Sequence, residues 1–205
     1  MTALKLAVVA AGLSQPSSTR LLADRLADAT VDRLRLQGVD AEVTVLELRD
    51  LAQDVTNNLL TGYPSPKLET ALAAVTGADG LIAVTPIFTT SYSGLFKSFI
   101  DVIDPTALAD LPVLLGATGG TERHSLAIDY AMRPLFTYLH ANPLTTGVYA
   151  ASADWGSSET GLADRIERAG ADLAAAMAGS ERSSRVVDPF ALPQGFSPVG
   201  GFGAQ

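Results

Sequence analysis

Hydroxyl side chains gather in a short segment near the N-terminus of the sequence. Ser14, Ser17, Ser18 and Thr19 stand there, and Arg20 follows them directly. The segment lies between a short apolar run and a long amphipathic pattern, where a strand gives way to a helix. A helix N-terminus presents unpaired N–H groups and the positive end of the helix dipole, and nearby hydroxyls complete a cradle for a phosphate dianion. The segment therefore indicates a phosphate site with added charge from Arg20, while simple capping of the helix by Ser17 or Ser18 stays open as the alternative.

The same segment lacks the motifs of better-known nucleotide and hydrolase loops. Neither G-x-x-x-x-G-K-[ST] nor G-x-G-x-x-G follows the first apolar run, which disfavours an NTPase and a standard dinucleotide-binding domain. Gly12, Leu13 and Ser14 begin like a nucleophile elbow, but Pro16 stands where G-x-S-x-G needs its second glycine. A serine hydrolase is therefore disfavoured as well.

Two further segments contain residue types that suit a planar heteroaromatic ring. Phe88 provides apolar surface among several hydroxyls, and Gly119 with Gly120 lets the backbone approach a ligand and expose N–H donors. The alternatives stay open that Phe88 or Tyr92 packs beneath its loop and that the two glycines form a plain turn. The candidate binding residues in these segments are Thr85, Pro86, Ile87, Phe88, Thr89, Thr118, Gly119 and Gly120.

Other polar residues give weaker signals for catalysis. Asp101 and Asp104 are three residues apart and could form an acid–base pair, but a solvated helix face is the favoured interpretation. His124 and His140 do not have a metal-ligand spacing, so surface or interface roles are expected for both. We predict no catalytic side chain and no metal ligand.

The composition narrows the class of protein. The chain has 205 residues, a formal net charge of -8 and no cysteine. The negative charge disfavours binding to nucleic acid or to an anionic membrane. The lack of cysteine excludes disulfides and thiolate chemistry. No apolar run approaches the roughly 18 residues of a membrane-spanning helix, so we expect a soluble, cytoplasmic protein.

The elements that must position the loops alternate between short apolar runs and helical patterns. We predict strands at 4–10, 41–46, 80–85, 112–118 and 144–150, and helices at 17–37, 66–75, 93–103, 122–140 and 159–178. Pro134 is expected to bend or break the fourth helix. This alternation predicts a five-stranded parallel sheet covered on both faces, a doubly wound three-layer α/β sandwich of strand order 2-1-3-4-5. It would occupy residues 1–178, followed by a Gly/Pro/Ser-rich tail at 179–205. The topological switch between the first and third strands would bring the three loops to one edge of the sheet.

Taken together, the three loops resemble those of the NADPH-dependent FMN reductase family, within the flavodoxin-like superfold. The resemblance rests on the Ser-Ser-Thr run, on residues 83–88 with 92–97, and on residues 117–121 with 129–134, and it covers roughly residues 4–150. Within the family, the resemblance is to the flavin reductases that supply reduced FMN to alkanesulfonate-type two-component monooxygenases. Phe88 stands where many relatives carry tyrosine, so a phenolic hydrogen bond is not expected there.

The resemblance implies that the candidate residues bind FMN, with its phosphate on the first loop and its ring against the other two. Hydride would pass from NADPH or NADH to flavin N5 without a side-chain acid or base. A homodimer or homotetramer is also implied, built partly on the helix containing Tyr130, where an extra residue can form a π-bulge. A flavin-dependent monooxygenase is the implied partner. Two alternatives stay open, an enzyme that keeps its FMN and reduces quinones or azo dyes, and a non-enzymatic flavodoxin-like electron carrier.

Overall fold

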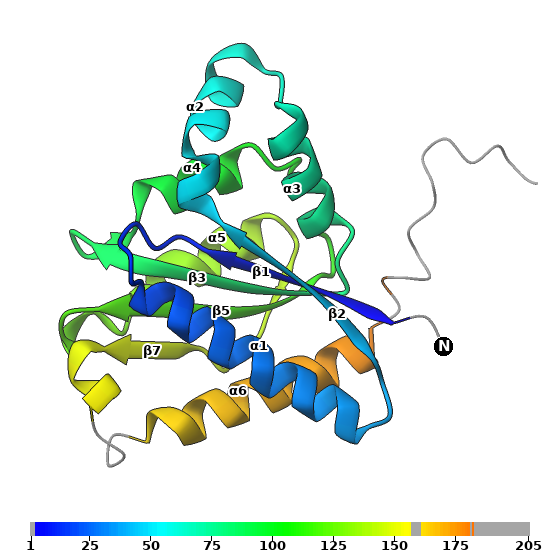
Figure 1. Cartoon of the computed structure of the whole chain (residues 1–205), viewed down its shortest axis with the longest axis vertical. Helices are drawn as coiled ribbons and strands as arrows, with labels where there is room; N and C mark the ends of the chain where they lie inside the picture. The colour runs from blue at the N-terminus through cyan, green and yellow to red at the C-terminus, as the bar shows by residue number, and fades with distance from the viewer. Residues whose placement is uncertain (1–2, 157–160, 181, 183–205) are drawn as a thin grey trace, which may run out of the picture.

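A seven-stranded sheet forms the middle layer of the molecule (Figure 1). This computed structural model describes residues 3–156, 161–180 and 182. The strands are β1 (Leu4–Ala10), β2 (Ala41–Glu47), β3 (Gly80–Phe88), β4 (Ser91–Tyr92), β5 (Pro112–Gly119), β6 (Asn142–Pro143) and β7 (Val148–Ala151). The main path runs β2-β1-β3-β5-β6 with parallel pairing, while β7 pairs with β5 and β4 lies antiparallel to β3. The predicted fold class is confirmed, and β1 lies between β2 and β3 as the predicted switch requires.

Helices cover both faces of this sheet. They are α1 (Ser18–Leu36), α2 (Ala52–Thr61), α3 (Pro66–Thr76), α4 (Gly94–Asp101), α5 (Arg133–Tyr138) and α6 (Leu162–Ala178). Figure 1 shows α1 and α6 side by side on one face. Leu6 and Val8 of β1 pack into the core beneath these two helices, while Ala7 and Val9 pack into the core beneath α3, α4 and α5. Because successive strand side chains point to opposite faces, the five consecutive apolar residues at the end of β1 are buried on both faces of the sheet.

The edge of the sheet differs from the single strand predicted at residues 144–150. The chain forms two short strands at this edge, β6 just before the predicted range and β7 at its end. Together with β4, which was not predicted either, this gives seven strands in place of five. Between the two paired stretches, β5 advances from Val113 to Gly116 while the edge chain advances from Pro143 to Val148. The edge chain therefore carries extra residues and bulges away from its neighbour. Arg133 stabilises the bulge by donating to the backbone carbonyls of Leu144 and Thr145.

The prediction of one helix over residues 122–140 is wrong in detail. The segment divides into a 3₁₀ turn, η2 (Glu122–His124), a π-helical turn, η3 (Ile128–Met132), and then α5. Pro134 does not break a helix but lies in the first turn of α5, where its missing N–H costs nothing. The π-helical turn contains Tyr130, so the π-bulge expected from the family resemblance is present.

Helix α2, with the 3₁₀ turn η1 (Leu48–Leu51) that precedes it, was not predicted. Val55 is the only buried residue of α2, so the apolar stripe by which an amphipathic helix is recognised is short here. It ends at Gly62, whose φ of 79° is in the left-handed region that favours glycine. Gly62 is therefore a sequence signal for the end of α2, whereas no capping side chain marks its start.

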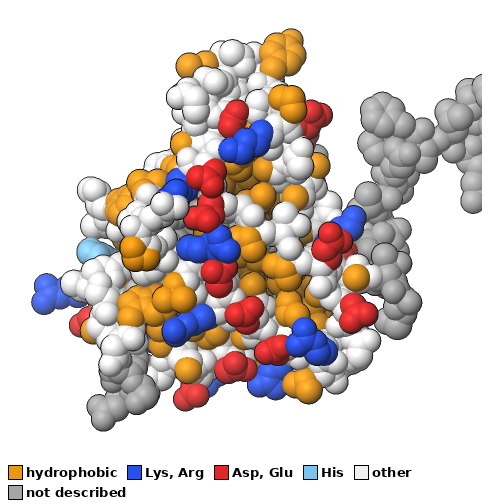
Figure 2. All heavy atoms as spheres, in the orientation of Figure 1, with side chains coloured by type: hydrophobic (Ala, Val, Ile, Leu, Met, Phe, Trp, Pro, Cys, Tyr) orange, Lys and Arg blue, Asp and Glu red, His pale blue; other side chains and the backbone are white. Residues whose placement is uncertain are grey.

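Two observations bear on the remaining sequence expectations. Among the described residues, no helix combines the length and apolarity needed to span a membrane. On the face seen in Figure 2, acidic and basic side chains are interspersed over the surface and basic ones do not gather in a patch.

Most of the predicted tail, and Glu159 at the predicted start of the last helix, lie outside the described residues. The boundary at residue 178 therefore stays a prediction.

Candidate functional site

A pocket of about 360 Å³ lies at the edge of the sheet where β1, β3 and β5 end. Ser18 reaches it from the start of α1, Phe88 from the end of β3, and Gly119 from the end of β5. Three segments far apart in the sequence thus meet at one place, which is the carboxyl edge next to the topological switch. The lining residues are Gly12, Leu13, Ser14, Ser18, Thr19, Pro86, Ile87, Phe88, Thr118, Gly119, Gly120 and Ser152.

The first turn of α1 forms the polar end of the pocket. Ser17 is the N-cap, and its Oγ accepts a hydrogen bond from the N–H of Arg20 at 3.2 Å. Ser17 therefore has the capping role that the sequence left open, and it does not line the pocket. The N–H groups of Ser18 and Thr19 lie in the first turn, where a helix provides no acceptor for them. Together with the hydroxyls of Ser14 and Ser18, they suit a phosphate dianion.

A buried hydrogen bond joins the first loop to the third. The hydroxyls of Thr19 and Thr118 lie 2.8 Å apart, and both residues are almost fully buried. One of them donates to the other, so the start of α1 is fixed against the end of β5. This bond explains how two loops separated by almost a hundred residues keep one geometry at the pocket.

The loop after β3 contributes the apolar wall. Phe88 is 48% exposed and lines the pocket, whereas Tyr92 packs against Phe96 with a ring-centroid distance of 5.9 Å. Of the two aromatic candidates, Phe88 therefore lines the pocket, while Tyr92 packs against the protein. Thr85 is fully buried, and its hydroxyl accepts a hydrogen bond from the N–H of Ser93 at 3.1 Å. Thr85 holds β3 to the start of α4 and does not line the pocket.

A tight turn follows Phe88. Residues Thr89 and Thr90 connect β3 to β4, and their φ angles are 48° and 71°. Two positive φ values at a two-residue hairpin loop are typical of a type I′ turn, which favours asparagine and glycine over β-branched residues. Thr89 does not line the pocket, but the turn determines how Phe88 is presented to it.

Arg20 does not face the pocket. Its guanidinium donates to Asp24 and to Glu47, each at 2.7 Å. The hydrogen bond with Asp24 raises the pKa of Arg20, and the two carboxylates already balance its charge. Arg20 therefore joins α1 to the end of β2, and the sequence could not show this because Glu47 is distant along the chain.

Ser152 lines the pocket but was not among the predicted residues. It directly follows β7, at the same edge of the sheet as the three recognised loops. The rule that ligands bind beyond the carboxyl ends of parallel strands could have identified it. Gly12 and Leu13 were also missed as lining residues, although they belong to the predicted first loop.

The weaker sequence candidates have structural partners. Asp101 accepts from Lys97 at 2.6 Å, and Asp104 accepts from the N–H and hydroxyl of Thr106, which lowers the pKa of Asp104. Asp101, the last residue of α4, therefore agrees with the favoured interpretation as a solvated helix face, whereas Asp104 lies beyond the end of α4 and holds the turn that follows it. In the described part of the chain, no cluster of three or more metal-ligating side chains was found.

Sequence comparisons associate this arrangement with flavin reductases. The family described as "NADPH-dependent FMN reductase" matches residues 4–156. An FMN reductase (NADPH) of Pseudomonas aeruginosa is 39% identical over 151 residues, which cover 74% of this chain and 78% of that protein. An NADH-dependent FMN reductase, SfnE, of Pseudomonas putida is 35% identical over 187 residues, which cover 90% of this chain and 97% of that protein.

Solved structures agree with the sequence matches. An oxidoreductase from Corynebacterium diphtheriae superposes with a TM-score of 0.85 at 40% identity, over 88% of this chain and 100% of that one. The apo form of an NADH:FMN oxidoreductase, EMOB, superposes with a TM-score of 0.70 at 28% identity, over 84% of this chain and 90% of that one. The family match at residues 4–156 includes all four segments that line the pocket.

Proposed function

The chain belongs to the NADPH-dependent FMN reductase family, and we propose that it reduces FMN with NADPH or NADH in the pocket beyond β1, β3 and β5. The observation that carries this proposal is the convergence of Ser18, Phe88 and Gly119 on one pocket. Its volume of about 360 Å³ is within the usual range for small-molecule sites.

The residues present fit FMN at both of its ends. At the polar end, the N–H groups of Ser18 and Thr19 and the hydroxyls of Ser14 and Ser18 would hold the phosphate dianion, which the helix dipole also favours. At the other end, Pro86, Ile87 and Phe88 offer apolar surface to a planar ring, and Gly120 has open space beside its Cα, so its backbone can approach the ring edge.

Bound FMN would supply the hydride acceptor, and the nicotinamide the hydride. The protein then orients the two rings relative to each other and keeps competing reactants away from them. Holding two reactants in line can lower a barrier by about 7–11 kcal/mol in model reactions, so a side-chain acid or base is not required. Phe88 is half exposed, which leaves room beside the proposed ring site for the second ring to enter from solvent.

The test is NAD(P)H oxidation by the purified protein with and without added FMN. We expect turnover that saturates with free FMN, and a preference for one nicotinamide that the assay will identify. Failure to bind flavin or to oxidise NAD(P)H in its presence would overturn the proposal. Flavin that copurifies and does not exchange would instead favour the FMN-retaining quinone or azo reductase, and tight FMN binding without NAD(P)H oxidation the electron carrier.

We further propose that the protein is a homodimer or homotetramer and that it delivers reduced FMN to a flavin-dependent monooxygenase. Leu126, Tyr130 and Tyr138 are 60%, 79% and 76% exposed around the π-helical turn and α5, and apolar side chains in such numbers at one place are typical of an interface. Sedimentation velocity should show an oligomer that Tyr130→Asp weakens and that Tyr63→Asp, at the exposed end of α2, leaves intact. A monomeric wild-type protein would contradict the oligomer.

A further inference from the structure

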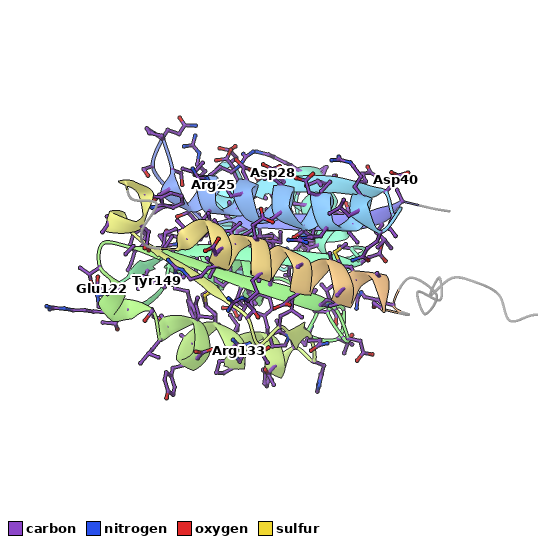
Figure 3. All side chains as sticks on the ribbon, turned by 90° about the horizontal axis from the view of Figure 1, so that it is seen from below. Arg25, Asp28, Asp40, Glu122, Arg133 and Tyr149 are labelled. Atoms are coloured by element: carbon purple, nitrogen blue, oxygen red, sulfur yellow. The ribbon has the colours of Figure 1, made fainter. Side chains whose placement is uncertain are left out.

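Tyr149 lies directly behind the third loop of the pocket without lining the pocket itself. It belongs to β7, opposite Ala117 of β5, so its side chain points to the same face of the sheet as Gly119 two residues further on. Its hydroxyl donates a hydrogen bond to the carbonyl oxygen of Thr121 at 2.6 Å. Figure 3 shows Tyr149 and Glu122 at the same end of the molecule, where the strands finish.

The ring of Tyr149 occupies the space that a side chain at position 119 would need. A Cβ added to Gly119 would lie 2.0 Å from the Tyr149 hydroxyl oxygen and 3.1 Å from the ring carbon that bears it. The first distance is impossible without a rearrangement, whereas the second requires only a small shift. Gly120, by contrast, has no atom within 4 Å of an added Cβ. Position 119 must therefore be glycine because of the tyrosine hydroxyl behind the loop, whatever ligand lies in front of it.

The hydroxyl is also held in place and kept as a donor. The backbone carbonyl of Tyr149 accepts from Arg165 at 2.6 Å, and Arg165 pairs with Asp154, whose other oxygen accepts from the N–H of Ala151 at 2.7 Å. Burial raises the pKa of Tyr149, and the charges of Glu122 and Asp154 raise it further. The hydroxyl thus keeps its proton at neutral pH, and Arg165 holds the backbone of Tyr149 to α6.

We propose that Tyr149 is a positioning residue that fixes the Gly119-Gly120-Thr121 backbone at the distance from which it contacts the flavin ring. The proposal rests on the proposed function, because it assumes that FMN lies against this loop. Tyr149 touches the loop from behind through Gly119 and through the carbonyl of Thr121. Removing the hydroxyl therefore changes the loop without removing any group from the pocket lining.

The test is a double-mutant cycle of Gly119→Ala, Tyr149→Phe and both together, with Tyr63→Phe as the matched control at an exposed tyrosine. Tyr149→Phe should raise the FMN dissociation constant by about three- to tenfold, the value of one hydrogen bond, with kcat changed by less than about twofold. Gly119→Ala should weaken FMN binding by about tenfold or more and lower the melting temperature of the flavin-free protein. The double variant should recover most of the melting temperature lost by Gly119→Ala and should bind FMN about as tightly as Tyr149→Phe alone, because the hydroxyl that clashes is gone and only the contact at 3.1 Å remains.

The outcomes separate the two proposals. If the wild type binds FMN and both single variants bind it equally well, or if Tyr149→Phe does not rescue Gly119→Ala, the positioning role is overturned while the FMN site stands. If Gly119→Ala does not fold, Tyr149→Phe alone decides through its KM for FMN against its kcat. If the wild type itself does not bind FMN, the proposed function fails and the positioning role fails with it.

Discussion

At the scale of single residues, two neighbouring serines at the start of α1 have different roles. Ser17 uses its hydroxyl to cap the helix, whereas Ser18 presents its hydroxyl and N–H to the pocket. The sequence predicted hydroxyls at this place, since a strand-to-helix loop rich in serine is readable as a pattern. It could not say which serine turns inward, because that depends on the entry angle of the chain. The orientation of Arg20 could not be predicted either, because its partner Glu47 belongs to another element, β2.

The two serines should respond oppositely to alanine substitution. Ser17→Ala removes the cap and should lower the free energy of unfolding by about 1 kcal/mol, with a smaller effect on FMN affinity. Ser18→Ala removes a hydrogen bond to a charged phosphate and should raise the FMN dissociation constant by about tenfold, with little change in stability. Urea unfolding and flavin fluorescence titration measure the two quantities. Equal effects of both variants on FMN affinity would contradict the assignment.

The hydroxyl pair of Thr19 and Thr118 should show a characteristic asymmetry. Thr118→Val leaves the buried hydroxyl of Thr19 without its partner and should cost about 1 to 2 kcal/mol of stability. Thr19→Val with Thr118→Val removes both hydroxyls and should cost less than the sum of the single changes. Thr137→Val, at an exposed threonine that donates to its own helix, is the control. Additive losses in urea unfolding would show that the two hydroxyls do not interact.

At the scale of elements, the hairpin of β3 and β4 carries strain beside the pocket. Thr89 and Thr90 hold positive φ angles that β-branched residues rarely adopt. The sequence predicted a loop after the third strand, and Pro86 and the hydroxyls were its signals. The hairpin itself was not predictable, because Thr-Thr is not a recognised turn pair and the strand β4 has only two residues. Likewise the bulge between β6 and β7 depends on Arg133, a contact that no local pattern reveals.

Glycine at the strained turn should stabilise the protein. Thr90→Gly relieves a φ of 71° and should raise the free energy of unfolding by about 0.5 to 1 kcal/mol, after the entropy that glycine adds to the unfolded chain. The same substitution in a helix, Thr56→Gly in α2, should lower it by about 0.4 kcal/mol. Urea denaturation of both variants measures the contrast. A loss of stability in Thr90→Gly would contradict the strain.

At the scale of the whole molecule, the two ends of the sheet have different tasks. The carboxyl edge holds the pocket, while the opposite edge is tied together by Arg182, which follows α6. Its guanidinium donates to the backbone carbonyls of Thr76, Ala78, Ala107 and Ala109 in two separate loops. The layer order could be predicted because alternating strand and helix patterns dictate a doubly wound sheet. The role of Arg182 could not be predicted, because this residue lies in a segment whose composition indicated only a tail.

Removing the Arg182 contacts should lower the stability of the protein without changing its affinity for FMN. Arg182→Gln leaves four part-buried carbonyls without a charged donor and should lower the free energy of unfolding by about 2 to 3 kcal/mol. FMN affinity should stay unchanged, because the pocket is at the other edge of the sheet. Arg168→Gln, on the exposed side of α6, is the control and should change neither quantity. A loss of FMN affinity in Arg182→Gln under conditions where it is folded would show that the two edges are coupled.

The most direct measurement is an experimental structure of the protein soaked with FMN. We expect the phosphate at the first turn of α1, against Ser18 and Thr19, and the ring between Phe88 and the backbone of Gly119 and Gly120. A second pocket, between β2 and α3, is lined by Thr44, Lys67 and Ala74 among others. Flavin bound there, or with its ring turned away from Phe88, would contradict the account.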